Sequence, residues 1–364
     1  MPERGPRADV RVATRWSPPG GLRHPIGPVD SLSVPGTSAP ATAVTVAAAL
    51  AGVSSVTLLA HINPDAASLG GALALGLVLE RRGVDVTVGF DQPGQTPESL
   101  RELPGQHLIR AIGTQLPACP DVVVTIDVAG TGRLGALRGL LDTAGCSVVI
   151  DHHASNPGFG ELNWIDPDAE AAVVLVAELI DELGEEITSD VAANLYAGLA
   201  TDTANFRFAT ERAHQLAARL LETGIRPAEV LRPIVDTHPF RWLSMLATVM
   251  AGASLDRDAA GGAGLVTVPI TLEDSAAVRQ EELDSVIDIA RTAAEAEVTA
   301  VLKQSDDEVW QVSLRSRNGL DIGRLASLLG GGGHPRAAGY TYHGPLDDLL
   351  TQLHAALATV SPSR

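Results

Sequence analysis

Cysteine and positive charge are both scarce in this sequence. Its 364 residues include only two cysteines, Cys119 and Cys146. Two thiols cannot build a framework of several disulfides or a zinc site with four thiolates. Lys and Arg number 26 against 44 Asp and Glu, so the formal net charge is −18. A protein that grips long nucleic-acid duplexes needs clustered basic charge, and this class is therefore disfavoured.

Aromatic residues and long apolar runs are also few. Aromatics make up 3% of the chain, too few for a platform that stacks an extended single strand. Tyr340 and Phe206 are the two candidates for stacking a single base, although each is more often a core residue. No uncharged run of about 18 strongly apolar residues occurs, which predicts no transmembrane span. The N-terminal arginines precede no apolar segment, so we expect no secretory signal, no membrane partner and a cytoplasmic location.

The length and the 45% content of apolar residues predict two domains with sizeable cores. Residues 1–40 are rich in Pro, Gly, Ser and Arg without a periodic apolar pattern, which predicts a disordered tail. We expect a first domain over 41–225, a linker with three prolines over 226–252, and a smaller domain over 253–360.

The first domain alternates between strand and helix patterns. Short apolar runs predict buried strands at 56–61, 84–90, 121–127 and 146–151. Helical patterns fall at 41–52, 70–83, 169–183, 189–201 and 211–224. This alternation predicts an α/β fold with a parallel sheet flanked by helices. The second domain reads as mixed α/β, with strands at 262–270, 297–304 and 308–316 and helices at 281–295 and 321–330.

Polar side chains fall at the ends of the predicted strands. His61, Asp127 and Asp151 each end an apolar run, and Asp65 lies in the loop after His61. Any one of them is more often a strand-end cap or a loop ion pair. Together they would meet at the carboxyl edge of the sheet, where open parallel sheets bind ligands. Carboxylate and imidazole without thiolate favour Mn²⁺ or Mg²⁺, with Zn²⁺ or Fe as alternatives.

Five segments stand in the order of a known set of motifs. They are HINPDAASLGGALAL (61–75), TIDVAG (125–130), VIDHHASN (149–156), GLATDTANFRF (198–208) and GGGGHPRAAG (330–339). In this order they resemble the DHH phosphoesterase family, and the last segment resembles the glycine-rich motif of its DHHA1 domain. The resemblance covers residues 44–357. The chain has no room for the extra domains of a long-strand exonuclease, and it is most similar to the oligoribonuclease and pAp-phosphatase (NrnA-type) branch.

The resemblance implies a site with two metal ions, normally Mn²⁺, with Mg²⁺ or another divalent ion as alternatives. It implies that His61, Asp65 and Asp127 hold the first ion, and that Asp127 bridges to a second ion bound also by His152 and Asp202. It places His153 over the bridging water and the scissile phosphate. It implies that Asp151 supports the loop and orients the ligand groups without binding a metal ion itself. Two such ions generate a hydroxide and stabilise the phosphoryl oxygens during displacement.

One position departs from the family pattern. The first motif normally reads His-x-x-x-Asp-x-Asp, and here its last residue is Ala67. A methyl group cannot replace that carboxylate, so we expect the second metal to bind weakly or not at all. Either an introduced substitution or a natural variant would explain Ala67.

The second domain is expected to choose the substrate. Gly330 begins a glycine run that lets the backbone approach a phosphate, and guanidinium groups bind phosphate in a bidentate fork. The expected substrate-binding residues are Arg315, Arg317, Gly331, Gly332, Gly333, His334 and Arg336. A flexible turn and solvated surface charges are the alternative explanations.

The sequence thus predicts a hydrolase of short oligoribonucleotides that also dephosphorylates 3′-phosphoadenosine 5′-phosphate, with linear or cyclic dinucleotides as related substrates. A non-catalytic nucleotide-binding protein of the same fold is the alternative that Ala67 supports. A metal-dependent pyrophosphatase is a third, which the GGGGH segment disfavours. The direction of cleavage and the formation of a homodimer stay open.

Overall fold

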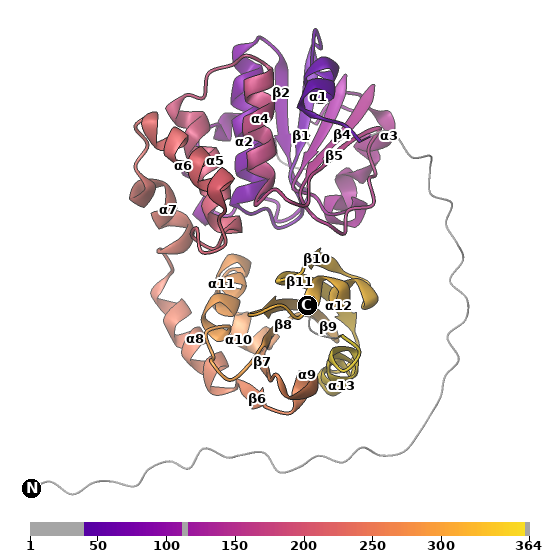
Figure 1. Ribbon diagram of the computed structural model, residues 1–364, viewed down its shortest axis with the longest axis vertical. Helices are drawn as coiled ribbons and strands as arrows, with labels where there is room; N and C mark the ends of the chain where they lie inside the picture. Colours follow the sequence, from indigo (N-terminus) through magenta and orange to yellow (C-terminus); the bar gives the residue numbers. More distant parts are fainter. Residues whose placement is uncertain (1–39, 111–115, 361–364) are drawn as a thin grey trace, which may run out of the picture. The chain divides into compact units, whose positions relative to one another are not determined.

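The computed structural model describes residues 40–110 and 116–360 (Figure 1). The expected disordered tail, apart from residue 40, lies outside these residues. No helix within the described ranges is both long enough and apolar enough to cross a lipid bilayer.

The first sheet has five strands in the order β2-β1-β3-β4-β5, and every pair of neighbours is parallel. The strands are β1 (Ser55–Leu59), β2 (Asp85–Gly89), β3 (Val122–Ile126), β4 (Cys146–Asp151) and β5 (Leu162–Ile165). The predicted parallel α/β sheet is therefore confirmed. The strand β5 was not predicted, because its four residues show no sustained apolar run.

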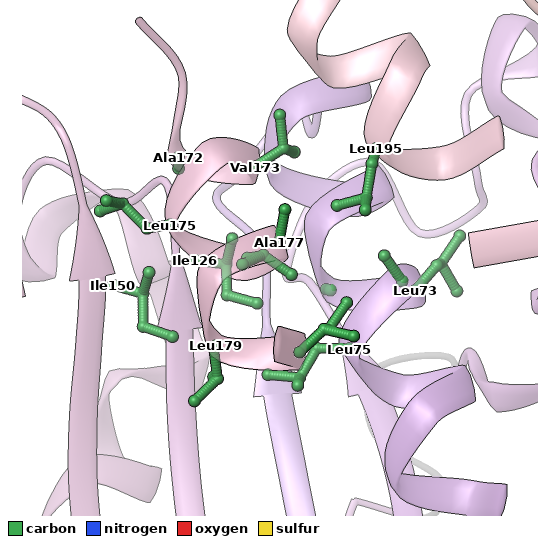
Figure 2. Packing of buried hydrophobic residues seen from close by; sticks show 14 of the residues in the cluster. Leu73, Leu75, Ile126, Ile150, Ala172, Val173, Leu175, Ala177, Leu179 and Leu195 are labelled. Carbon is green, nitrogen blue, oxygen red and sulfur yellow. The ribbon is translucent and has the colours of Figure 1, made fainter. Parts of the chain in front are cut away.

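Helices cover this sheet and bury its apolar side chains. They are α1 (Ala43–Ala49), α2 (Ala66–Arg81), α3 (Leu140–Thr143), α4 (Ala172–Glu182), α5 (Ser189–Asp202) and α6 (Glu211–Glu222), with short 3-10 helices at Glu98–Leu100, Gln106–Leu108 and Thr131–Gly139. Figure 2 shows Leu73 of α2, Ile126 of β3 and Leu179 of α4 in one apolar cluster. A Cβ on Gly70 would lie 2.8 Å from the carbonyl oxygen of Asn194, so the glycine lets α2 approach α5 closely. This packing fixes the N-terminus of α2, which carries part of the candidate site.

The segment expected to link the domains folds as two helices, α7 (Pro227–Val235) and α8 (Phe240–Ala251). Pro227 occupies the first turn of α7 and Pro239 caps α8, positions that suit proline because no helical amide bond is lost there. Helix α7 packs on the core of the first sheet and α8 on a core of the second.

The second sheet has six strands in the order β10-β11-β9-β8-β7-β6 and is mixed, with β7 and β8 parallel and the other pairs antiparallel. The strands are β6 (Ser254–Asp256), β7 (Leu265–Ile270), β8 (Val298–Asp306), β9 (Val309–Ser316), β10 (Gly332–His334) and β11 (Ala337–His343). The helices are α9 (Ala259–Gly262), α10 (Leu272–Ser275), α11 (Gln280–Ala290), α12 (Ile322–Leu328) and α13 (Leu346–Leu357). This confirms a separate mixed α/β region.

Candidate metal centre and substrate-binding residues

The strand order places the candidate ligands at the topological switch point of the first sheet, where successive strands are added on opposite sides of β1. From β1 the chain goes to β2 on one side and then returns to β3 on the other, so β1 and β3 flank the crevice where such sheets bind ligands. His61 follows β1 and Asp127 follows β3. Asp127 has a φ of +61° and Asn63, two residues after His61, has a φ of +51°. Left-handed backbone is uncommon for residues other than glycine and concentrates at functional sites.

The first group of ligands comprises His61, Asp65 and Asp127, whose ligand atoms all lie within 4.8 Å of one another. Asp65 is the N-cap of α2, and its Oδ1 accepts hydrogen bonds from the amides of Ala67 and Ser68. Its Oδ2 lies 3.4 Å from Nε2 of His61. Burial raises the pKa of Asp65, but the charge and hydrogen bond of His61 outweigh burial and hold that pKa well below its usual value. The carboxylate is therefore ionised, as a metal ligand must be.

The second group comprises Asp127, His152 and Asp202, with ligand atoms again within 4.8 Å. Nε2 of His152 lies 3.3 Å from Oδ1 of Asp127 and 3.5 Å from Oδ2 of Asp202. Nδ1 of His152 lies 3.0 Å from the carbonyl oxygen of Ala169. Because a carbonyl only accepts, Nδ1 carries the proton of the neutral ring and Nε2 keeps a lone pair for a metal ion. Asp127 belongs to both groups.

The electrostatics of this cluster fit a divalent cation. Among the described residues, the buried Oδ1 of Asp127 and Oδ2 of Asp202 form no hydrogen bond. Burial and the charge of Asp127 raise the pKa of Asp202 well above its usual value. Burial lowers the pKa of His152, but the Asp127 and Asp202 carboxylates raise it to about 10. Buried carboxylates without partners are costly, and oxygen and imidazole ligands without thiolate match Mn²⁺ or Mg²⁺.

His153 is held by Asp151 beside the two groups. Nδ1 of His153 donates to Oδ1 of Asp151 at 2.8 Å and lies 3.7 Å from Oδ1 of Asp127. Asp151 is fully buried, and its Oδ2 accepts a hydrogen bond of 2.6 Å from Nδ2 of Asn156. Both oxygens of Asp151 thus have protein donors. The supporting role of Asp151 stays a prediction.

His334 and Arg315 share one face of the second sheet. His334 pairs with Ala337 across β10 and β11, and Ala337 pairs with Arg315 across β11 and β9. Directly paired residues point to the same face, so the two side chains lie about 10 Å apart, two strand spacings. The His334 ring lies 4.4 Å from the ring of His152 and is stacked 4.5 Å from that of His153. Arg315 therefore lies on the same face of the second sheet as His334, whose ring contacts the metal-ligand cluster.

The other two predicted arginines differ in their surroundings. The guanidinium of Arg336 lies 5.5 Å from the ring centre of Phe208, six residues after Asp202. Arg317 is exposed and donates to the carbonyl oxygen of Ala293 at 3.2 Å. In this structure a backbone carbonyl thus holds Arg317, whereas His334 and Arg336 contact residues near the ligand cluster.

The glycine run is tightly packed. A Cβ on Gly331 would lie 2.1 Å from the carbonyl oxygen of Gly339, and one on Gly332 would lie 2.9 Å from Oγ of Ser155. Gly333 has a φ of +138° and donates its amide to Oγ of Ser155 at 3.3 Å. Close packing of β10 therefore requires the glycines, and a phosphate-binding role stays a prediction.

The two base-stacking candidates are packed against other side chains. Tyr340 is buried in the core of the second sheet. The Phe206 ring lies 5.5 Å from that of Tyr196 and is stacked 5.8 Å from that of His214. The structure thus favours the core interpretation for both.

Ala67 adjoins the second group of ligands. It is fully buried in the first turn of α2, and a Cβ on Gly198 of α5 would lie 2.9 Å from its Cα. Asp202 follows Gly198 by four residues on α5, which places both on the same side of that helix. A longer side chain at position 67 would therefore start against Gly198, one helical turn before Asp202.

Sequence reasoning assigned no role to two residues at this site. Nη2 of Arg133 lies 2.9 Å from Nδ1 of His61, and Asn156 donates to Asp151. Asn156 ends the VIDHHASN segment, so its position in that motif was the available signal. For Arg133 we find no such signal, because its contact depends on the fold of the 3-10 helix after β3.

The parallel sheet, the shared Asp127 and the adjoining glycine-rich strand together define a two-domain DHH-type protein. Residues 55–199 match the family described as "DHH family, N-terminal domain", and residues 264–360 match the "DHHA1 domain". The chain belongs to the DHH family and carries a DHHA1 domain after its DHH domain.

Its relatives include two proteins described as bifunctional oligoribonuclease and PAP phosphatase NrnA. The protein from Thermus thermophilus is 34% identical over 286 residues, which cover 78% of this chain and 83% of the relative. The protein from Bacillus subtilis is 26% identical over 260 residues, covering 66% of this chain and 81% of the relative. An exopolyphosphatase-related protein from Bacteroides fragilis has the same fold, with a TM-score of 0.73 and 21% identity over 85% of this chain and 93% of that structure.

Proposed function

We propose that this chain is a divalent-metal-dependent phosphoesterase that hydrolyses short oligoribonucleotides to mononucleotides and dephosphorylates 3′-phosphoadenosine 5′-phosphate. The observation that carries the proposal is the pair of three-residue groups that share Asp127, each with ligand atoms within 4.8 Å. The similarity to proteins described as NrnA supports this choice of substrates. Linear and cyclic dinucleotides are related substrates.

The residues of the first domain would hold two ions, Mn²⁺ by preference. His61, Asp65 and Asp127 hold one, and Asp127, His152 and Asp202 hold the other. Bound divalent ions lower the pKa of water and stabilise charge on phosphoryl oxygens. His153 is a hydrogen-bonding side chain at the reacting phosphate, and Asp151 fixes its orientation through the 2.8 Å hydrogen bond at Nδ1.

The residues of the second domain would hold the substrate. Arg315, Arg336 and His334 supply donors for a terminal phosphate, with Arg317 at the margin. His334 lies against His152 and His153, so the phosphate anchor is close to the metal centre. This proximity, together with a net charge of −18, favours short substrates over long polymers.

One observation favours a second candidate function. Ala67 stands beside Asp202 where the family pattern has a carboxylate, and loss of a ligand would weaken the second metal site. The protein would then bind short nucleotides with little or no hydrolysis.

Turnover measurements separate the two functions. The substrates are a 5′-phosphorylated RNA dinucleotide and 3′-phosphoadenosine 5′-phosphate, each assayed with increasing Mn²⁺. For an enzyme, we expect Asp127→Asn to abolish hydrolysis and to weaken Mn²⁺ binding. Asp121→Asn is the matched control, because Asp121 accepts from the amides of Ser54 and Ser55 outside the site. Substrate binding without product in both the Ala67 chain and Ala67→Asp would establish the binding protein instead.

A further inference from the structure

We propose that Asn156 is a positioning residue for the reaction: it fixes Asp151, and through Asp151 the orientation of His153. This inference rests on the proposed function. The side-chain hydrogen bonds of Asn156 within the described residues go to Asp151, Val128 and Gly158, and its effect would be transmitted through them.

All polar atoms of the Asn156 side chain have partners. Nδ2 donates to Oδ2 of Asp151 at 2.6 Å and to the carbonyl oxygen of Val128 at 3.0 Å. Oδ1 accepts from the amide of Gly158 at 2.9 Å. A carboxylate and a carbonyl oxygen only accept, so the NH₂ group of the amide must face them. The orientation of Asn156 is therefore determined by its surroundings.

Asp151 depends on this donor. It is fully buried, and its two carboxylate oxygens accept from His153 on one side and Asn156 on the other. A buried carboxylate oxygen that loses its donor carries a large desolvation penalty. Without Asn156, Asp151 would rotate toward another donor, and the Nδ1 hydrogen bond that orients His153 would loosen.

The second hydrogen bond of Asn156 joins two strand ends. Val128 directly follows Asp127, whose left-handed backbone carries the shared carboxylate. Asn156 thus ties the loop after β3 to the end of β4. This tie holds Nδ1 of His153 at its distance of 3.7 Å from Oδ1 of Asp127.

The chemistry of the contacts explains why asparagine occupies this position. The site needs two donors and one acceptor on a short, planar group. Aspartate has nearly the same shape but, when ionised, presents an acceptor to the Asp151 carboxylate. Serine and alanine supply one donor or none.

Kinetics of Asn156→Ala test the inference. We expect kcat to fall at least tenfold, while KM and the Mn²⁺ dissociation constant stay within about twofold, because no ligand to substrate or metal is removed. The measurements are made in the Ala67 chain and in Ala67→Asp. If Asn156→Ala folds poorly, Asn156→Asp keeps the side-chain shape and should lose at least as much kcat.

A double-mutant cycle with His153→Ala identifies the route of the effect. If Asn156 acts through His153, then Asn156→Ala added to His153→Ala causes no further loss of kcat. Asn163→Ala is the matched control, because Asn163 also bonds backbone groups with both ends of its amide, and these two hydrogen bonds are with Gly160 rather than with Asp151. We expect Asn163→Ala to change thermal stability and to leave kcat unchanged.

A measurement without turnover separates this inference from the proposed function. The ¹⁵N resonances of the His153 imidazole report the hydrogen bond at Nδ1, and we expect Asn156→Ala to shift them while Asn163→Ala does not. Unchanged His153 resonances, an unchanged kcat, or a loss that adds fully to that of His153→Ala would each overturn the positioning role. Absence of turnover in both backgrounds would contradict the proposed function and leave the resonance test to decide the role of Asn156.

Discussion

Substitution of Ala67 by aspartate should change stability and metal binding in opposite directions. Position 67 lies in the first turn of α2, where a negative charge is favoured by about 0.3–1 kcal/mol. It is also fully buried, next to Asp202, whose pKa is already well above its usual value. An uncompensated buried charge costs about 3–5 kcal/mol. In the metal-free protein we therefore expect Ala67→Asp to lower the free energy of unfolding by about 2–5 kcal/mol.

Metal ions should reverse this loss, because the new carboxylate becomes a ligand of the second site. Mn²⁺ at one hundred times its dissociation constant would stabilise the protein by about 2.7 kcal/mol for each site filled. We expect kcat to rise by two or more orders of magnitude. A hundredfold gain corresponds to a lowering of the barrier by about 2.8 kcal/mol.

The assay combines thermal unfolding with and without Mn²⁺ and the rate of dinucleotide hydrolysis against Mn²⁺ concentration. Ala67→Asn is the matched control, since it has the same size without the charge and should gain little activity. Equal rates of the Ala67 chain and Ala67→Asp at saturating Mn²⁺ would show that position 67 is no ligand position. The alignment of the first motif would then be wrong.

Three further predictions concern the substrate anchor, the protons of the site and the glycine run. Arg315→Ala should raise KM for a 5′-phosphorylated dinucleotide by about 10- to 100-fold, because hydrogen bonds to charged groups contribute about 1.5–3 kcal/mol. Arg317→Ala should raise this KM less. An unchanged KM for Arg315→Ala would show that Arg315 does not bind the terminal phosphate. His152 has a pKa of about 10 in the metal-free protein, so metal binding should displace a proton from His152 and should tighten as pH rises toward 10. Calorimetry in two buffers of different ionisation enthalpy measures the released proton. A binding enthalpy that does not depend on the buffer would contradict this prediction. Because this folded-state pKa lies above the ordinary value of 6.5, the same group stabilises the metal-free fold below about pH 6.5 and loses that contribution as pH approaches 10. Gly331→Ala should destabilise the protein by about 3 kcal/mol or more, since its Cβ would lie 2.1 Å from the carbonyl oxygen of Gly339. An unchanged midpoint of thermal unfolding would show that β10 can move away from Gly339 without cost.

Four of the five strands of the first sheet could be predicted, because each of these four is an apolar run with a clear end, whereas β5 is not. The predicted run at 146–151 coincides with β4, and Asp151 ends it as expected. The strands β10 and β11 were not predicted, because the glycines that begin the segment indicate a turn. The need for glycine in this segment becomes evident only from the structure, in which Gly339 and Ser155 pack directly against it.

A residue of the candidate site could be predicted from the sequence when it belongs to one of the motifs. A residue that reaches the site only through a tertiary contact could not. Motif order indicated the residues that the structure brings together around Asp127. The attachment of Arg317 to Ala293 and the contact of Arg133 with His61 depend on chain segments that meet only in the fold. No local pattern of residue types specifies such contacts.

The shared Asp127 has a consequence for how this protein can change over evolution. The three groups of candidate ligands that share it draw all their members from residues 61–202, which precede the DHHA1 domain, whereas the arginines and the glycine strand belong to the DHHA1 domain. Under the proposed function, mutations in the second domain would therefore alter which nucleotide is accepted without removing a member of these groups. Mutations of Asp127 cannot be compensated in this way, because a single carboxylate belongs to all three groups. Selection should thus hold Asp127 fixed while the surface around Arg315 diversifies among proteins of this architecture.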